Sequence, residues 1–230
     1  ASAYVGQMLA SIASQSYDNW KIILIDDVSD DHEKIKQRDT IDRWQRMVDP
    51  GDPSRRIHVV WNDDKKWEVA NVLNGISMCD DDDIVCRIDA DDWLTEIDGL
   101  AYLNAVYNQT AADAIWTAHR WGFTDRNISG AMPVDADPYV HPWVSSHLKT
   151  FRKRLINEIK DENFRGEDGS YIRRAGDQAI YLPILFNARR RGFIPRVMYH
   201  YTINDVPETY QTPDARFQRD EALFLRARGY

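Results

Sequence analysis

Short apolar segments rich in β-branched residues alternate with segments of helical periodicity through the first half of the chain. Segments 21–25 and 84–88 are each followed by a run of aspartates, which is typical of buried strands that end in a polar turn. Alternating strands and helices predict an α/β domain with a mainly parallel sheet. The elements predicted for this half are helices at 4–16, 32–48, 67–78 and 96–109 and strands at 21–25, 57–61, 84–88 and 114–118.

The second half of the chain is less regular, and nothing in it marks a domain boundary. No repeat, low-complexity tract or Gly/Ser-rich linker is present. A length of 230 residues fits one large domain or two small ones. The elements predicted here are strands at 147–151 and 194–201 and helices at 177–191 and 213–228.

Charge is distributed unevenly along the chain. Residues 1–145 carry 13 Lys and Arg against 26 Asp and Glu, whereas residues 146–230 carry 16 against 11, within a net charge of −8. An acidic part next to a basic part predicts one side that binds a metal ion and another that meets anions. Solvated faces that differ in charge explain the same imbalance, so the pattern alone leaves both interpretations open.

Hydropathy and cysteine content bear on where the protein works. No apolar segment approaches the roughly 20 residues of a membrane-spanning helix, so no integral membrane segment is expected. The two cysteines, Cys79 and Cys86, do not have the spacing of zinc ligands. We expect both to be reduced thiols of an intracellular, cytoplasmic protein.

Three aspartates, Asp89, Asp91 and Asp92, follow the predicted strand at 84–88. Carboxylates this close repel one another unless a cation or full solvation screens them. Oxygen ligands select hard cations such as Mg²⁺ or Mn²⁺, which commonly bind one or two carboxylates together with substrate phosphates. A solvated turn or a helix cap is the alternative, and the acidic run at 80–83 is interpreted as such a solvated loop.

Two further aspartates stand where a carboxylate could act on a substrate. Asp27 follows the strand at 21–25, and ligands of α/β sheets bind beyond the carboxyl ends of the strands. Its carboxylate could accept a hydrogen bond from a base N–H or a ribose hydroxyl, while residues 29–31 cap the next helix. Asp177 stands at a predicted helix start, where it could act as a general base or simply cap the helix.

The order of these segments resembles that of the family 2 glycosyltransferases. Residues 3–17 are similar to the family's first helix with its Ser-Ile-x-x-Gln-x-Tyr pattern. Residues 23–31 are similar to its Val-Asp-Asp-Gly-Ser-x-Asp turn, with Val28 in place of the glycine. Residues 69–76 resemble its Ala-Arg-Asn-x-Gly-Ile helix, and Ile-Asp-Ala-Asp-Asp at 88–92 matches its Leu-Asp-Ala-Asp-Asp metal motif.

The resemblance implies a Rossmann-like GT-A fold with a mixed, mainly parallel sheet flanked by helices. It also implies a metal-dependent inverting glycosyltransferase that uses a nucleotide-sugar, most often a UDP-sugar. In this scheme Asp27 contacts the base and Asp89 the ribose. Asp91 and Asp92 hold Mn²⁺ or Mg²⁺ on the diphosphate, so Asp91 also helps to bind the nucleotide-sugar. Asp177 falls where the family places its catalytic aspartate and would deprotonate the acceptor hydroxyl.

The resemblance also suggests a division of the chain. Residues 1–110 would bind the nucleotide-sugar, and residues 111–230 would carry the acceptor site and the catalytic base. The family's opening strand, with its Pro-x-Tyr-Asn segment, is missing from the sequence, which suggests an N-terminal truncation. The Gln-x-x-Arg-Trp motif of the processive synthases is also absent, which favours a single transfer. His147 or His200 could complete the metal shell.

None of these motifs identifies the acceptor. The basic residues lie where this fold usually binds it, so an anionic acceptor follows as a hypothesis: a phosphorylated glycan, a teichoic-acid-like polymer, a lipid phosphate or a modified nucleic acid. Ordinary helix surface is the alternative. Trp121 and Trp143 could stack on a sugar or simply pack. The basic residues concerned are Lys149, Arg152, Lys153, Arg154, Arg173, Arg174, Arg189, Arg190 and Arg191.

Other functions remain open on the sequence alone. A nucleotidyltransferase of similar fold also uses carboxylates to hold Mg²⁺, although the Gly-rich loop that it normally carries is not visible. An Asp-based phosphatase also begins with Asp-x-Asp but needs a small or aliphatic residue where Trp93 stands. A catalytically dead sugar-nucleotide-binding protein would bind nucleotide and metal without turnover, and an Asp177→Asn change would not affect it.

Overall fold

The computed structural model describes residues 2–203 and 213–230, and every helix and strand predicted from the sequence is present in it. The largest difference is at α6, which ends at Asn187 because the chain turns there into the strand that begins at Arg191. The helices are α1 (Ser2–Ala13), α2 (Asp31–Val48), α3 (Pro53–Arg56), α4 (Trp67–Ser77), α5 (Gly99–Thr110), α6 (Gly176–Asn187) and α7 (Pro213–Arg228). The strands are β1 (Ile22–Asp26), β2 (Ile57–Trp61), β3 (Ile84–Arg87), β4 (Trp93–Leu94), β5 (Ala114–Trp121), β6 (Lys149–Arg152) and β7 (Arg191–Tyr201).

The described strands form a small sheet and a large one. In the small sheet β1 and β2 run parallel, with Ile22 opposite Ile57. The large sheet has the order β3-β6-β5-β7-β4, and in it only β5 and β7 run parallel among the described pairs. The pairing is therefore mixed but not mainly parallel, because β6 enters between β3 and β5 in the opposite direction.

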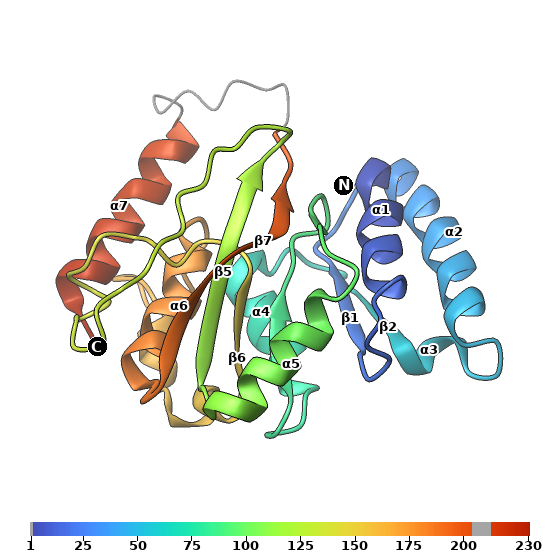
Figure 1. Ribbon diagram of the computed structural model, residues 1–230. Helices are drawn as coiled ribbons and strands as arrows, with labels where there is room; N and C mark the ends of the chain where they lie inside the picture. Colours follow the sequence, from blue (N-terminus) through green and yellow to red (C-terminus); the bar gives the residue numbers. More distant parts are fainter. Residues whose placement is uncertain (1, 204–212) are drawn as a thin grey trace.

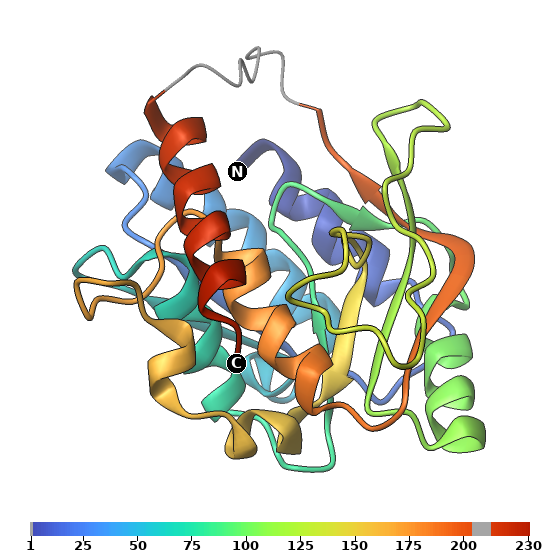
Figure 2. The same cartoon turned by 90° about the vertical axis from the view of Figure 1, so that its left-hand side faces the viewer.

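Two apolar cores cover the two faces of the large sheet. Along β5 the side chains alternate, so that Trp116 packs in the core under α6 and Ile115 in the core that includes α5. The second core also takes in α1, α2 and the small sheet, which joins the two sheets into one body. Figure 1 shows α1, α2 and the small sheet at one end of the molecule and α6 and α7 at the other. In Figure 2 α6 (orange) and α7 (red) lie side by side.

Both predicted acidic turns begin where a strand ends. β1 ends at Asp26 and β3 ends at Arg87, so Asp27 and the turn at 88–92 follow directly. The turn after β1 leads into α2, whose N-cap is Asp30; its side chain accepts a hydrogen bond from the backbone N–H of Glu33, as expected for this turn.

No described helix has the length and apolarity that crossing a membrane would require. Cys79 and Cys86 are both free and half-buried.

Candidate functional site

The acidic turn after β3 is held in shape by the end of β7. The Tyr199 hydroxyl accepts a hydrogen bond from the backbone N–H of Asp89 (3.1 Å) and donates one to Oδ2 of Asp92 (2.7 Å). The backbone N–H of Thr202 donates to the other oxygen of Asp92, also at 2.7 Å. Asp92 is 1% exposed, and burial raises its pKa to about 7. The turn is therefore fixed before any ligand arrives.

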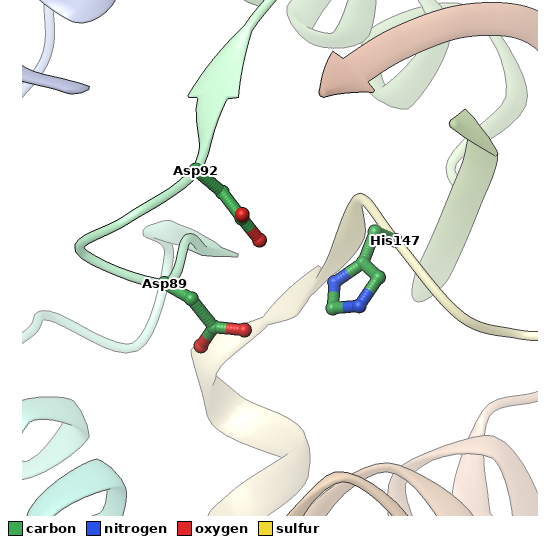
Figure 3. A group of neighbouring side chains, drawn as sticks. All are labelled: Asp89, Asp92 and His147. Atoms are coloured by element: carbon green, nitrogen blue, oxygen red, sulfur yellow. The ribbon is translucent and has the colours of Figure 1, made fainter. Parts of the chain in front are cut away.

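Asp89, Asp92 and His147 each direct one ligand atom toward a common space, with these atoms within 4.8 Å of one another (Figure 3). His147 lies just before β6, and its ring stacks on Tyr199 at 4.7 Å. Burial, followed by the positive charge of Lys149, lowers the pKa of His147 to about 2. The imidazole is consequently neutral and able to bind a metal ion. Two carboxylates and a neutral imidazole form a donor set that fits a divalent cation such as Mn²⁺.

The other two side chains considered as metal ligands lie differently. The carboxylate of Asp91 is not part of the group of three, and its backbone carbonyl accepts a hydrogen bond from the Thr202 hydroxyl. His200 is buried, and its Nδ1 accepts a hydrogen bond from Arg120 Nε at 3.1 Å. Its ring stacks on Trp93 at 3.7 Å. Of the two histidines, the structure brings His147 to the aspartates.

Asp177 is the second residue of α6 and faces two cations. Its Oδ1 lies 2.5 Å from Arg87 Nη1 and 2.8 Å from Lys149 Nζ. The side chain is 36% exposed, and no side chain makes a capping hydrogen bond at the N-cap, Ala175, so Asp177 does not serve as the cap. Burial alone would raise the pKa of Asp177, but Lys149 and Arg87 together lower it well below its usual range. Asp177 is thus an ionised carboxylate at physiological pH.

Arg87 and Lys149 are residues of this site that the sequence did not reveal. They are direct cross-strand partners, Arg87 on β3 and Lys149 on β6. Lys149 is 2% exposed, although the sequence placed it among the basic residues expected at an acceptor surface. A lysine between Leu148 and Phe151 in a predicted strand could have signalled a buried ion pair, since lysine is almost never fully buried unless paired.

Asp27 orders the loop ahead of α4. Its carboxylate accepts hydrogen bonds from the backbone N–H groups of Lys66 (2.7 Å) and Trp67 (2.9 Å) and from Asn62 Nδ2 (3.0 Å). Burial acts to raise the pKa of Asp27, and these hydrogen bonds lower it overall. The predicted contact between Asp27 and a base therefore involves a carboxylate that already has three protein donors.

A cavity of about 320 Å³ brings Asp89, His147 and Asp177 together. Aromatic side chains form another part of its wall. They include Trp121 and Trp143, for which the sequence allowed either stacking on a sugar or simple packing. Asp27, Asp91 and Asp92 are not among the lining residues. The residues that line it are Glu68, Arg87, Asp89, Trp121, Ile128, Trp143, Ser146, His147, Arg174, Asp177, Tyr201 and Gln218.

Several residues of the basic C-terminal half are engaged within the protein. Lys153 pairs with Asp81 and Arg154 with Asp113, at 2.6 and 2.8 Å. The guanidinium of Arg152 donates to the backbone carbonyl of Ala112 at 3.0 Å. Arg174 lines the cavity and pairs with Asp214 at 2.9 Å.

The family model described as glycosyl transferase family 2 matches residues 1–156. No curated protein matches the chain.

Solved structures share the fold at low sequence identity. S. aureus TarS has a TM-score of 0.62 and 15% identity, covering 87% of this chain and 34% of that one. S. aureus TarS 1–349 in complex with UDP-GlcNAc has a TM-score of 0.63 and 14% identity, covering 91% and 58%. The mannosyltransferase PcManGT from Pyrobaculum calidifontis, in complex with GDP-Man and Mn²⁺, has a TM-score of 0.62 and 16% identity, covering 90% and 55%. This chain therefore spans less than two thirds of each, and the likeness confirms the predicted GT-A α/β fold.

Proposed function

Because this chain belongs to glycosyl transferase family 2, we propose that it transfers a sugar from a nucleotide-sugar to an acceptor hydroxyl. The observation that carries the proposal is the shared cavity, which Asp89 and His147 line together with Asp177. A candidate cation site and a candidate base thus face the same space, whose volume is in the range of small-ligand pockets. In this proposal residues 1–110 supply the donor side and residues 111–230 the base.

The proposed donor is a UDP-sugar. In support, the solved structures of similar fold include a complex with UDP-GlcNAc and one with GDP-Man. Asp27 would contact the base, Asp89 the ribose, and Asp91 the diphosphate through the ion. Asp27 lies at the carboxyl end of β1, where α/β sheets bind their ligands.

The proposed cofactor is Mn²⁺ or Mg²⁺, held by Asp91 and Asp92. We add Asp89 and His147 to this proposed ligand set, because their ligand atoms converge with that of Asp92. The imidazole favours Mn²⁺, since Mg²⁺ prefers oxygen ligands. When bound, such an ion would stabilise the negative charge of the leaving nucleoside diphosphate.

The proposed reaction is a single displacement with inversion. The acceptor oxygen attacks the anomeric carbon while the bond from that carbon to the diphosphate oxygen breaks, and the hydroxyl proton passes to Asp177. Lys149 and Arg87 keep the Asp177 carboxylate ionised and oriented, but they also make it a weak base. Proton transfer therefore belongs to the transition state, when the attacking hydroxyl has become acidic.

A donor screen tests the proposal. Thermal unfolding and hydrolysis would be measured with UDP-, GDP-, CMP- and dTDP-sugars, with and without Mn²⁺. A ligand at 100 times its Kd stabilises the folded state by about 2.7 kcal/mol, so binding of the true donor is readily detected. We expect stabilisation by a UDP-sugar only when Mn²⁺ is present. If no nucleotide-sugar stabilises the protein in the presence of Mn²⁺, the proposal fails.

Two further measurements address the finer parts of the proposal. NMR of the anomeric proton of the product reports inversion or retention directly. The size distribution of products formed on an oligosaccharide acceptor reports single or processive transfer, and we expect one added sugar per acceptor. Rates on phosphorylated and neutral acceptors at low and moderate salt test the anionic acceptor, which requires a rate that falls as salt rises.

A further inference from the structure

Glu68 is a second carboxylate beside Asp177, and it comes from a different part of the fold. It is in the first turn of α4 and accepts a hydrogen bond from Nη2 of Arg87. Its side chain is 31% exposed and lines the same cavity as Asp177. Nothing in the sequence patterns marked this residue.

The start of α6 leaves the space that Glu68 fills. A Cβ atom added to Gly176 would overlap the carboxyl group of Glu68, closer than unbonded atoms can approach. The backbone of Gly176 is not in the left-handed region, so glycine here leaves room for the Glu68 carboxyl group in this orientation and is not required by backbone conformation. A carboxyl group from α4 thus occupies the volume that a side chain at position 176 would otherwise take.

Arg87 connects three acidic side chains through one guanidinium group. Nη1 donates to Asp177 at 2.5 Å, whereas Nη2 donates to Glu68 and, at 3.3 Å, to Asp89. The Arg87 side chain is 13% exposed, so water offers its N–H groups little alternative to these three carboxylates. Without Glu68, Nη2 would have only the long contact to Asp89, and the guanidinium could rotate away from Asp177.

We propose that Glu68 is a positioning residue that fixes the Arg87 guanidinium between the candidate cation ligand Asp89 and the candidate base Asp177. This inference rests on the proposed glycosyl transfer. The carboxylate of Glu68 orients Arg87, and Arg87 in turn orients Oδ1 of Asp177 toward Lys149. Glu68 itself does not contact the reacting atoms.

The first test is Glu68→Ala, assayed by release of nucleoside diphosphate from the donor identified in the screen. Loss of an orienting partner commonly costs about 10- to 100-fold in activity, so kcat should fall by that amount. The Kd for the nucleotide with Mn²⁺ should change much less than kcat, because Arg87 makes only a long contact, at 3.3 Å, to the proposed donor ligand Asp89. Glu68→Gln, which keeps a hydrogen-bond acceptor for Arg87, should retain more activity than Glu68→Ala.

The second test moves the carboxylate from position 68 to position 176. The double variant Glu68→Ala/Gly176→Asp places an acid in the vacated volume, and we expect it to recover part of the lost kcat. The matched control Glu68→Ala/Gly176→Asn has the same size without the charge and should recover clearly less activity. A merely structural role for Glu68 predicts the same result for both double variants.

A readout independent of turnover uses the metal-free protein. The Arg87 side-chain N–H signals, assigned in NMR spectra by their loss in Arg87→Lys, should exchange slowly with solvent in the wild type and rapidly in Glu68→Ala. This measurement decides the matter even if a double variant fails to fold. Wild-type kcat and slow Arg87 exchange in Glu68→Ala would overturn the inference, whereas a wild type that binds no nucleotide-sugar would overturn the proposed function instead.

Discussion

Lys149 Nζ lies 2.8 Å from Oδ1 of Asp177, in an ion pair between strand β6 and the start of helix α6. The lysine is 2% exposed, so this charge is kept inside the protein by the carboxylate that it meets. Arg87, its cross-strand partner on β3, approaches the same oxygen. The first turn of α6 is thereby held to β3 and β6 of the large sheet by charge as well as by apolar packing.

Replacing Lys149 with methionine removes the charge and keeps most of the side-chain volume. We expect the pKa of Asp177 to rise, because Lys149 is the largest electrostatic contribution that lowers it. Stability should fall by about 1–3 kcal/mol, less than for a fully buried pair, because the carboxylate left behind is partly solvated. Urea unfolding and a carboxyl ¹³C titration measure the two effects.

The control for this change is Lys153→Met, which removes an ion pair to the exposed Asp81. A surface pair is worth about 0–1 kcal/mol, so this variant should unfold close to the wild type. Equal stability of the two variants would contradict a structural role for the pair between Lys149 and Asp177.

Mn²⁺ binding to the free protein should depend on His147. The variant His147→Ala removes one of three converging ligands, and we expect the Mn²⁺ affinity to fall by about 10- to 100-fold. Loss of the free-ion signal in electron paramagnetic resonance measures the affinity. His58→Ala, at an exposed position on β2, is the matched control and should bind Mn²⁺ like the wild type. If both variants bind equally well, His147 is not a ligand.

The two predicted metal ligands of the acidic motif should differ in how they act. Asp92→Asn should weaken Mn²⁺ binding in the absence of nucleotide, because Asp92 belongs to the converging group. Asp91→Asn should chiefly weaken nucleotide binding in the presence of Mn²⁺, since its carboxylate lies outside that group. Calorimetric titrations with Mn²⁺ alone and with UDP plus Mn²⁺ separate the two. Identical losses in both titrations would count against this division.

Glu68→Gln should change the pH dependence of stability in protein treated with a chelator. Burial, together with the nearby Asp177 and Asp89, raises the pKa of Glu68 from 4.5 to about 7. Between these values the folded chain keeps a proton that the unfolded chain has lost, so this group makes stability fall as the pH rises. The variant lacks that contribution. The difference between its Tm and the Tm of the wild type should therefore increase as the pH rises from 4.5 to about 7.

Calorimetry across this pH range measures the difference between the two Tm curves. Glu162→Gln, at an exposed position, serves as the control and should run parallel to the wild type. A Glu68→Gln curve that is also parallel would show that Glu68 ionises alike in the folded and unfolded chains.

Val28→Gly should stabilise the protein. Val28 has φ of 65°, in the left-handed region where a Cβ costs roughly 1–2 kcal/mol, and it is 42% exposed. Glycine also raises the conformational entropy of the unfolded chain, which offsets part of this effect. The expected net increase in the free energy of unfolding is about 0.5–1 kcal/mol. Val134→Gly, at an exposed loop position without positive φ, is the control and should not gain. Lower stability of Val28→Gly in urea unfolding would contradict the expectation.

The helices and strands followed from the sequence because the signals that specify them are local. The apolar run of β3 and the aspartates after it lie within a few residues, so the position of the acidic turn could be predicted. The same holds for the turn after β1, where Val28 even stands in place of the family's glycine. The pairing of the strands could not be predicted in the same way, because it joins segments that are far apart in the sequence. The large sheet is mixed because β6, from the irregular half of the chain, lies between β3 and β5.

The same distinction between local and long-range signals applies to the candidate site. By itself the sequence determined that Asp89, Asp92 and Asp177 are carboxylates at strand and helix ends, because motif and periodicity are properties of neighbours along the chain. Only the tertiary structure decided that His147 joins the first two and that Lys149 holds the third. Those contacts depend on strand order and register, and a shift of one residue in a strand would turn every such side chain to the opposite face of the sheet.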